Sequence, residues 1–138
     1  MILVRIPRAA LARLWPVIAP FAEKMAAEMP DDWPPAELYR RAAAGILTLW
    51  AGWSPDEKAV VAIAGTEIHR KPSGRTGLVI AMTAGSERRK WIHLVAELER
   101  FGADCGCDFV EIRGRPGWAR LLPEYRAKPG VVLTKELS

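Results

Sequence analysis

The spacing of the apolar residues changes near Ile46, and this change constrains the fold more than any other feature of the sequence. Between residues 8 and 28, apolar side chains recur mostly three or four positions apart, a spacing that predicts one face of a helix. From Ile46 onward they gather in short runs rich in valine, isoleucine and tryptophan, which favour β-strands. The predicted helical face consists of Leu11, Leu14, Trp15, Ile18, Phe21 and Met25.

The order of the elements follows from these runs and from the turn residues between them. Residues 2 to 6 predict a short strand, and Asp32, followed by a pair of prolines, predicts the cap of a second helix that ends near Ala44. The runs ILTLWAGW and KAVVAIAGTEIHRK predict a hairpin. The next run, GLVIAMTA, is apolar throughout, which predicts the central strand of the sheet, covered on both faces.

The last part of the sequence predicts a helix, a strand, a short helix and a final strand. Ser86 is expected to cap the first of these helices, whose apolar residues from Trp91 to Phe101 lie three or four positions apart, and Gly102 or Gly106 to end it. CDFVEIRG predicts a strand, PGWARLLPEYR a short helix begun by Pro116, and GVVLTKEL the final strand.

Length and composition limit the classes of protein to consider. The 138 residues fit one domain over residues 1–138, and the hydrophobic half of the composition with a net charge of only +4 argues against disorder. No apolar run approaches the roughly 18 to 20 residues that span a bilayer, so no membrane partner or secretory signal is expected. Cys105 and Cys107 are too close for a useful disulfide, which indicates a reducing cytosol.

The order of elements from Ile46 to Leu137, with the N-terminal strand and helix pair before it, resembles the GNAT acyltransferase fold. The resemblance implies an α/β (α+β) architecture, a mixed central sheet of about six strands with helices on both faces. More narrowly, the compact size and the basic segment GSERRKW look like the small GNAT-like proteins encoded among the virion genes of tailed bacteriophages.

The resemblance also implies where a cofactor would bind. In GNAT enzymes the turn after the fourth strand has a Q/R-x-x-G-x-G/A pattern, because its backbone N–H groups approach the pyrophosphate of acetyl-CoA. Here the turn keeps a single glycine and carries the acidic Glu87. If CoA binds, the resemblance assigns it to Gly85, Ser86, Arg88, Arg89 and Lys90; if the departures from the pattern abolish binding, the chain has no cofactor.

Candidate catalytic residues are few. Glu67 and Glu111 lie in predicted strands, where a carboxylate near the site could act as a general base, although either could instead face water or pair with Arg113. The resemblance implies a tyrosine general acid in the last helix, and Tyr125 lies about one turn from the matching position.

A metal site is not expected, because His69 and His93 have no Cys, Asp or Glu neighbours at the spacings that metal ligands show. Ser86 lacks the G-x-S-x-G context of a nucleophile.

A partner-binding surface is a further possibility that the residue types raise. Trp33 lies in the polar segment PDDWPP and Trp118 in the basic segment RGRPGWAR, so both are candidates for exposed contact residues, together with Arg113, Arg115 and Arg120. The same basic residues could attract nucleic acid, or they could be ordinary solvated side chains.

Two hypotheses of function follow. The first is a non-catalytic GNAT-like bacteriophage protein of the host cytoplasm or the virion, which contacts other virion or assembly proteins. The alternative is a CoA-dependent N-acetyltransferase in which Arg88 and Arg89 compensate for the missing glycines. A nucleic-acid-binding module is the third reading, and it lacks a recognition-helix signature.

Overall fold

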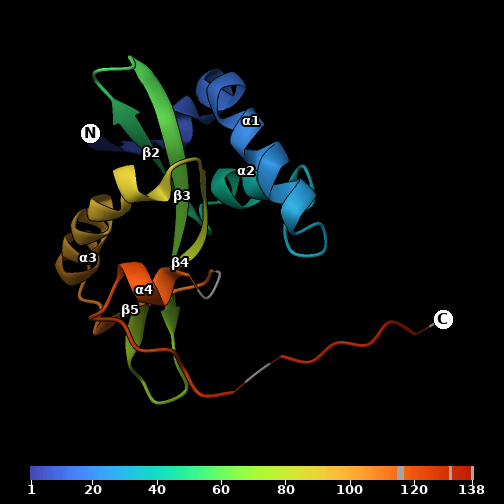
Figure 1. Ribbon diagram of the computed structural model, residues 1–138, viewed down its shortest axis with the longest axis vertical. Coiled ribbons are helices and arrows are strands. Elements are labelled where there is room, and N and C mark those ends of the chain that lie inside the picture. The colour runs from blue at the N-terminus through green and yellow to red at the C-terminus, as the bar shows by residue number, and fades with distance from the viewer. Residues whose placement is uncertain (115–116, 131, 138) are drawn as a thin grey trace.

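The computed structural model describes residues 1–114, 117–130 and 132–137. Figure 1 shows its helices and strands. In chain order these are β1 (Ile2–Ile6), the short 3₁₀ turn η1 (Arg8–Ala10), α1 (Leu11–Glu28), α2 (Glu37–Ala43), β2 (Thr48–Ser54), β3 (Ala59–Arg70), β4 (Thr76–Gly85), the 3₁₀ turns η2 (Arg88–Lys90) and η3 (Ile92–Leu94), α3 (Val95–Asp104), β5 (Phe109–Ile112) and α4 (Trp118–Leu121).

The described strands form one mixed sheet in the order β1-β2-β3-β4-β5. Neighbouring strands are antiparallel except for β4 and β5, which run parallel because α3 connects them. The sheet therefore has five strands rather than about six, and β3 rather than β4 is central.

The predicted final strand is the reason for the smaller count. Its described residues, 130 and 132–137, form no strand, and Figure 1 shows this segment leading away from the sheet. Val132, Leu133 and Leu137 are almost fully exposed, so the apolar side chains that favoured a strand have no sheet face to cover.

Helices cover both faces of the sheet, and a separate apolar cluster fills each interface (Figure 1). Under α1 and α2 the helical residues Leu11, Ile18 and Met25 pack on the sheet, as their spacing predicts. Under α3 and α4 the cluster includes Trp91, Leu94, Val95 and Leu98. We call these the α1/α2 face and the α3/α4 face.

Strand β4 belongs to both clusters. Val79 faces α1 and α2, while Leu78 and Ile80 face α3 and α4, and all three are at most 1% exposed. The expectation that this apolar run is covered on both faces is therefore confirmed. Among the residues that the structure describes, no helix combines the length and the apolarity needed to cross a membrane.

Two helices begin later than their sequences predict. Asp32 does not cap α2, which starts at Glu37 without a side-chain cap and whose first turn is instead stabilised by ion pairs from Glu37 to Arg40 and Arg41. Hydrogen bonds from these two arginines lower the pKa of Glu37 to about 2.

The segment after β4 also departs from its prediction, since Ser86 caps no helix there. Glu87 adopts a left-handed conformation, with φ 52° and ψ 55°, and two 3₁₀ turns follow before α3 starts at Val95. A left-handed residue cannot continue a right-handed helix, so the periodic apolar residues begin outside the α-helix. Gly106, with φ 80°, follows the end of α3, as predicted for a glycine at this position.

Candidate functional site

The parallel strands β4 and β5 pair along only part of β4. The pairing runs from Gly77 opposite Phe109 to Ile80 opposite Ile112, and a last hydrogen bond joins the Arg113 N–H to the Ile80 carbonyl oxygen at 3.0 Å. Strand β4 continues beyond this point to Gly85, paired only with β3. Within the described residues, the backbone of 81–84 therefore has no strand neighbour on the β5 side, and we call this stretch the open edge of β4.

A β-bulge lies at the start of the open edge. Thr66 of β3 lies opposite Ile80 and Gly65 opposite Met82, so Ala81 is an extra residue in β4. A bulge turns the following side chains by one position, and both Ala81 and Met82 indeed pack on the α1/α2 face. The bulge therefore bends β4 at the position where β5 leaves it.

A tight turn follows the open edge. Gly85 has φ 150°, and a Cβ atom there would lie 2.8 Å from the Val61 carbonyl oxygen, so only glycine fits. Among the described residues, the backbone N–H groups of 86–89 donate to no acceptor, whereas the Lys90 N–H donates to the Glu87 carbonyl at 2.8 Å. The turn thus leaves a run of free N–H groups beside the end of β4.

Three cationic side chains surround these N–H groups. Arg88 lies with its guanidinium 5.3 Å from the centre of the Trp118 ring, and Arg89 is exposed. Lys90 pairs with Glu87 at 2.8 Å, which raises the pKa of Lys90. Because both members of that pair are well exposed, the pair is weak, and the turn remains a net cationic site.

Trp118 joins the segment after β5 to the turn after β4. A Cβ atom at Gly114 would lie 2.6 Å from the Trp118 ring, whose centre is 5.8 Å from that of Trp91. Trp118 is only 8% exposed, so the expectation that it contacts a partner is wrong. The aromatic ring is needed to pack the two chain segments where the strands separate.

Trp33 is also buried, which corrects the second predicted contact residue. It is 6% exposed, packs under α1 and α2, and carries the Arg41 guanidinium 4.6 Å from its ring centre. Of the arginines predicted beside the tryptophans, Arg113 pairs with Glu111, Arg120 is exposed, and residue 115 lies outside the described residues.

Glu67 and Glu111 lie on the same face of the sheet, on either side of Val79. Val79 is opposite Glu67 in β3 and opposite Glu111 in β5, and its side chain packs on the α1/α2 face. Adjacent strands are about 5 Å apart, so the two carboxylates are separated by roughly 10 Å. Both precede the position where β4 and β5 separate by a single residue pair.

The Glu67 carboxylate holds a histidine that the sequence analysis considered only as a metal ligand. Glu67 is 8% exposed; its Oε2 accepts from Arg41 Nη1 at 3.1 Å, and its Oε1 is 2.8 Å from His69 Nε2. Because a carboxylate only accepts, we assign the proton to Nε2, which leaves Nδ1 with a free lone pair. The His69 side chain is 32% exposed, so it is open to solvent. Two positions apart in a strand, both residues share one face, and this alternation is the signal that could have found the pair.

The Glu111 carboxylate has a different environment. It accepts hydrogen bonds from Lys128 at 2.7 Å, Lys71 at 3.3 Å and Arg113 at 3.2 Å. These cations, Lys128 foremost, lower the pKa of Glu111 to about 2. A carboxylate with so low a pKa is a poor base near neutral pH, and its contacts attach the chain after α4 to β5.

Tyr125 is on the opposite face from Glu67. It packs with the α3/α4 cluster, and its hydroxyl donates to Glu99 Oε2 at 2.6 Å. Burial, together with Glu99, raises the pKa of Tyr125 above its usual value. Both effects make its proton harder to release. Elsewhere in the described chain, no group of three or more His, Cys, Asp or Glu side chains could hold a metal ion.

Comparison with known proteins places this geometry among solved structures. No family model and no curated protein matches the sequence. An aminoglycoside acetyltransferase from an uncultured soil metagenomic sample is similar, with a TM-score of 0.69, 16% identity and coverage of 99% of this chain and 98% of that one. The ribosomal-protein-alanine N-acetyltransferase of Brucella melitensis biovar Abortus 2308 has a TM-score of 0.66 at 14% identity, covering 99% and 100%.

A third similar structure is an aminoglycoside N-acetyltransferase, AAC(6')-Iy, in complex with CoA, with a TM-score of 0.68 at 13% identity, covering 98% of this chain and 93% of that chain. These names contradict the prediction of a non-catalytic bacteriophage protein, because the similar structures are acetyltransferases and nothing connects the chain with a virion. Identities this low establish the fold alone. The chain has a GNAT-like fold.

Proposed function

We propose that this protein is a CoA-dependent N-acetyltransferase. The observation that carries the proposal is the separation of β4 from β5 after Ile80, which leaves an open strand edge that leads into a cationic turn with free N–H groups. A ligand with an amide-containing arm and a pyrophosphate group matches both parts, because the strand edge offers backbone hydrogen bonds and the turn offers N–H groups and positive charge. The CoA complex of a similar structure supports the same assignment.

The residues of the turn would hold the phosphates. Gly85 provides the sharp bend, the N–H groups of 86–89 are free to donate, and the side chains of Arg88, Arg89 and Lys90 supply positive charge. Guanidinium groups form bidentate, charge-assisted hydrogen bonds with phosphate oxygens. These contacts compensate for the glycines that the GNAT pattern has and this turn lacks. When bound, acetyl-CoA supplies an acetyl group activated as a thioester.

On the acceptor side, His69 is the proposed general base. An amine must lose a proton to attack a carbonyl carbon, and the free lone pair of His69 Nδ1 can take it directly or through a water molecule. Glu67 keeps the other ring nitrogen protonated and stabilises the imidazolium that forms. Arg41 in turn holds Glu67, and Glu37 holds Arg41 at 2.7 Å, so the base rests on a connected network. Glu67 is thus a positioning residue in this proposal.

The direct test is isothermal titration of the protein with acetyl-CoA. We expect saturable binding, and the double variant Arg88→Ala/Arg89→Ala should bind at least roughly tenfold more weakly, since a charge-assisted hydrogen bond contributes about 1.5–3 kcal/mol. The matched control is Arg13→Ala/Arg100→Ala, which removes the same charge from exposed positions on α1 and α3. Absence of any binding, or equal losses in both double variants, would refute the proposed cofactor site.

A further inference from the structure

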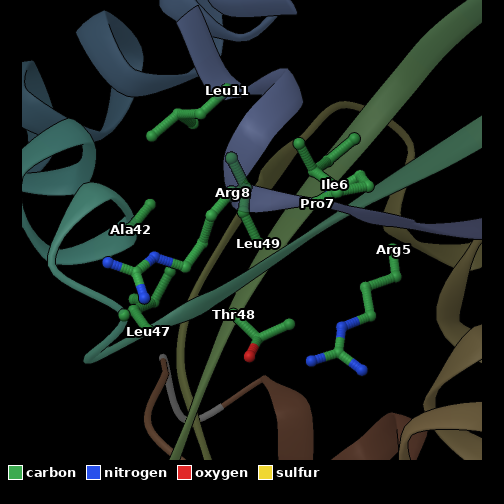
Figure 2. Close-up of a pocket in the computed structure, with 10 residues that line it drawn as sticks. Arg5, Ile6, Pro7, Arg8, Leu11, Ala42, Leu47, Thr48 and Leu49 are labelled. Atoms are coloured by element: carbon green, nitrogen blue, oxygen red, sulfur yellow. The ribbon is translucent and has the colours of Figure 1, made fainter.

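A second cationic site lies on the other side of the sheet, where β1 ends and β2 begins. Figure 2 shows this cavity, which has a volume of about 410 Å³. Its wall combines residues at the end of β1, the following turn, the end of α2 and the start of β2. The last pair of the two strands is Ile6 opposite Leu49, so Thr48 has no β1 partner and the cavity opens beside it. We call it the Arg5–Arg8 pocket.

Arg8 is held in the pocket by two contacts. Its Nη2 donates to the Ala43 carbonyl oxygen, near the end of α2, at 2.7 Å. Its guanidinium also lies flat against Gly45, where a Cβ atom would come within 2.9 Å of Nη1. One donor is therefore used, and a guanidinium has five. The remaining N–H groups are held in place without an acidic partner in the described part of the chain.

Arg5 contributes a second guanidinium from the neighbouring strand. Its guanidinium carbon lies 5.3 Å from the centre of the Phe101 ring, which fixes the side chain against α3. In Figure 2 the Arg5 side chain extends toward Thr48, and Arg8 extends toward Ala42 and Leu47. The lining residues include no acid, so two positive charges and the Thr48 hydroxyl are left unneutralised at the pocket.

The rest of the wall is apolar. Leu11, Leu47 and Leu49 are buried side chains whose surfaces line the pocket, together with Ile6 and Pro7. Pockets that bind small molecules are typically about 300–1,000 Å³ in volume, mostly apolar, with a few polar groups that fix the orientation. The Arg5–Arg8 pocket has this composition.

We propose that the Arg5–Arg8 pocket binds a small organic acid, with its carboxylate on the two guanidinium groups and its apolar body on the leucines. A planar guanidinium matches a carboxylate with two parallel hydrogen bonds. Inorganic phosphate would satisfy the charges but leave the apolar wall exposed to water, so the wall favours a ligand with a hydrocarbon part. The proposal does not depend on acetyl transfer, because no lining residue belongs to the turn after β4.

The test uses octanoate and phenylacetate as probes, with octanamide, phenylacetamide and inorganic phosphate as comparison compounds, and follows backbone amide shifts by NMR. We expect the two acids to shift the signals of Arg8, Gly45 and Thr48 saturably. The uncharged amides should bind at least tenfold more weakly, since they lose the ionic contact. Tighter binding of inorganic phosphate than of the acids would overturn the assignment of a carboxylate with an apolar body.

The variant Arg5→Met keeps an apolar side chain against Phe101 while removing the charge, so the protein should fold, which circular dichroism can verify. It should bind the acids at least tenfold more weakly, whereas Arg13→Met, an equal loss of charge on α1, should bind as the parent does. Thr48→Val provides a second, nearly isosteric variant with a weaker expected loss. Equal affinities of all these proteins, or no saturable shifts with any acid, would overturn the proposal.

Discussion

Two glutamates flank Val79 at the same level of the sheet, and their surroundings differ. Glu67, on β3, is buried under α1 and α2 and holds one arginine and one histidine. Glu111, on β5, holds three cations, two of which are more than half exposed. The difference teaches that equal residue types at equivalent positions on one face acquire distinct roles from their partners. A single titratable partner makes Glu67 part of a proton-transfer pair, whereas three permanent cations fix Glu111 as an anion.

The largest expected effect is on the histidine of this comparison. His69→Ala should lower the kcat for acetyl transfer to an amine by about 10²–10⁴-fold, because it removes the general base. Stopped-flow or thiol-release assays measure the rate, and added imidazole should restore part of it. The control is His93→Ala, an exposed histidine on η3. Equal rates in both variants would rule out His69 as the base.

A smaller effect is expected when the two glutamates are changed in turn. Glu67→Gln should lower kcat roughly 10- to 100-fold, because a neutral amide holds the imidazolium less well, while the KM for acetyl-CoA stays within about twofold. Glu111→Gln should leave kcat within about twofold, since Glu111 contacts no group of the proposed reaction. If Glu111→Gln proved the more damaging change, the assigned roles of the two carboxylates would be reversed.

The third prediction concerns acid stability on the Glu111 side. The pKa of Glu111 in the folded protein is about 2, below its ordinary value of 4.5. Its contribution to the free energy of unfolding is therefore complete above about pH 4.5 and is lost as the pH falls toward 2. Allowing for the exposure of Lys128 and Arg113, we expect a contribution of about 1–2 kcal/mol.

Urea denaturation at pH 6, 5, 4 and 3 measures this contribution. The parent should lose more stability over this range than Glu111→Gln, with Glu124→Gln, an exposed acid after α4, as the matched control. Glu37 titrates in the same range and is unchanged in all three proteins, so it cancels from the comparison. Parallel pH profiles for the parent and Glu111→Gln would show that the three ion pairs contribute no net stability.

The smallest effect is expected at Tyr125, on the face opposite both glutamates. Tyr125→Phe removes the hydrogen bond to Glu99 and should lower the free energy of unfolding by about 1 kcal/mol, with kcat unchanged within about twofold. Because the pKa of Tyr125 is raised, its ultraviolet titration should occur at higher pH than that of an ordinary tyrosine. A large loss of kcat in this variant would assign Tyr125 to the reaction after all.

Local patterns predicted most of the elements correctly. The three-or-four spacing of Leu11, Ile18 and Met25 predicted a buried helix face, and the continuous apolar run of β4 predicted a strand covered on both faces. These signals are reliable because each depends on residues close together in the chain. The failures, a cap at Asp32 and a strand after residue 129, occurred where a local preference met no tertiary partner.

The candidate site was predictable only in part. The turn after β4 and the two glutamates stood out as residue types, but the pairing of Glu67 with His69 did not, because the sequence does not reveal which face of a strand is covered by helices. Trp33 and Trp118 were misassigned for a related reason. Polar neighbours in sequence suggested exposure, whereas the rings pack against residues distant in the chain.

The sequence by itself determined where helices and strands form, which side chains are apolar on each, and that a cationic turn follows the fourth strand, because these depend on backbone preferences and short-range periodicity. Only the tertiary structure decided where β4 and β5 separate, which cations surround each carboxylate, and that Arg5 and Arg8 meet at one pocket. Those outcomes depend on contacts between residues far apart in the chain, and their energies exist only once the chain has packed.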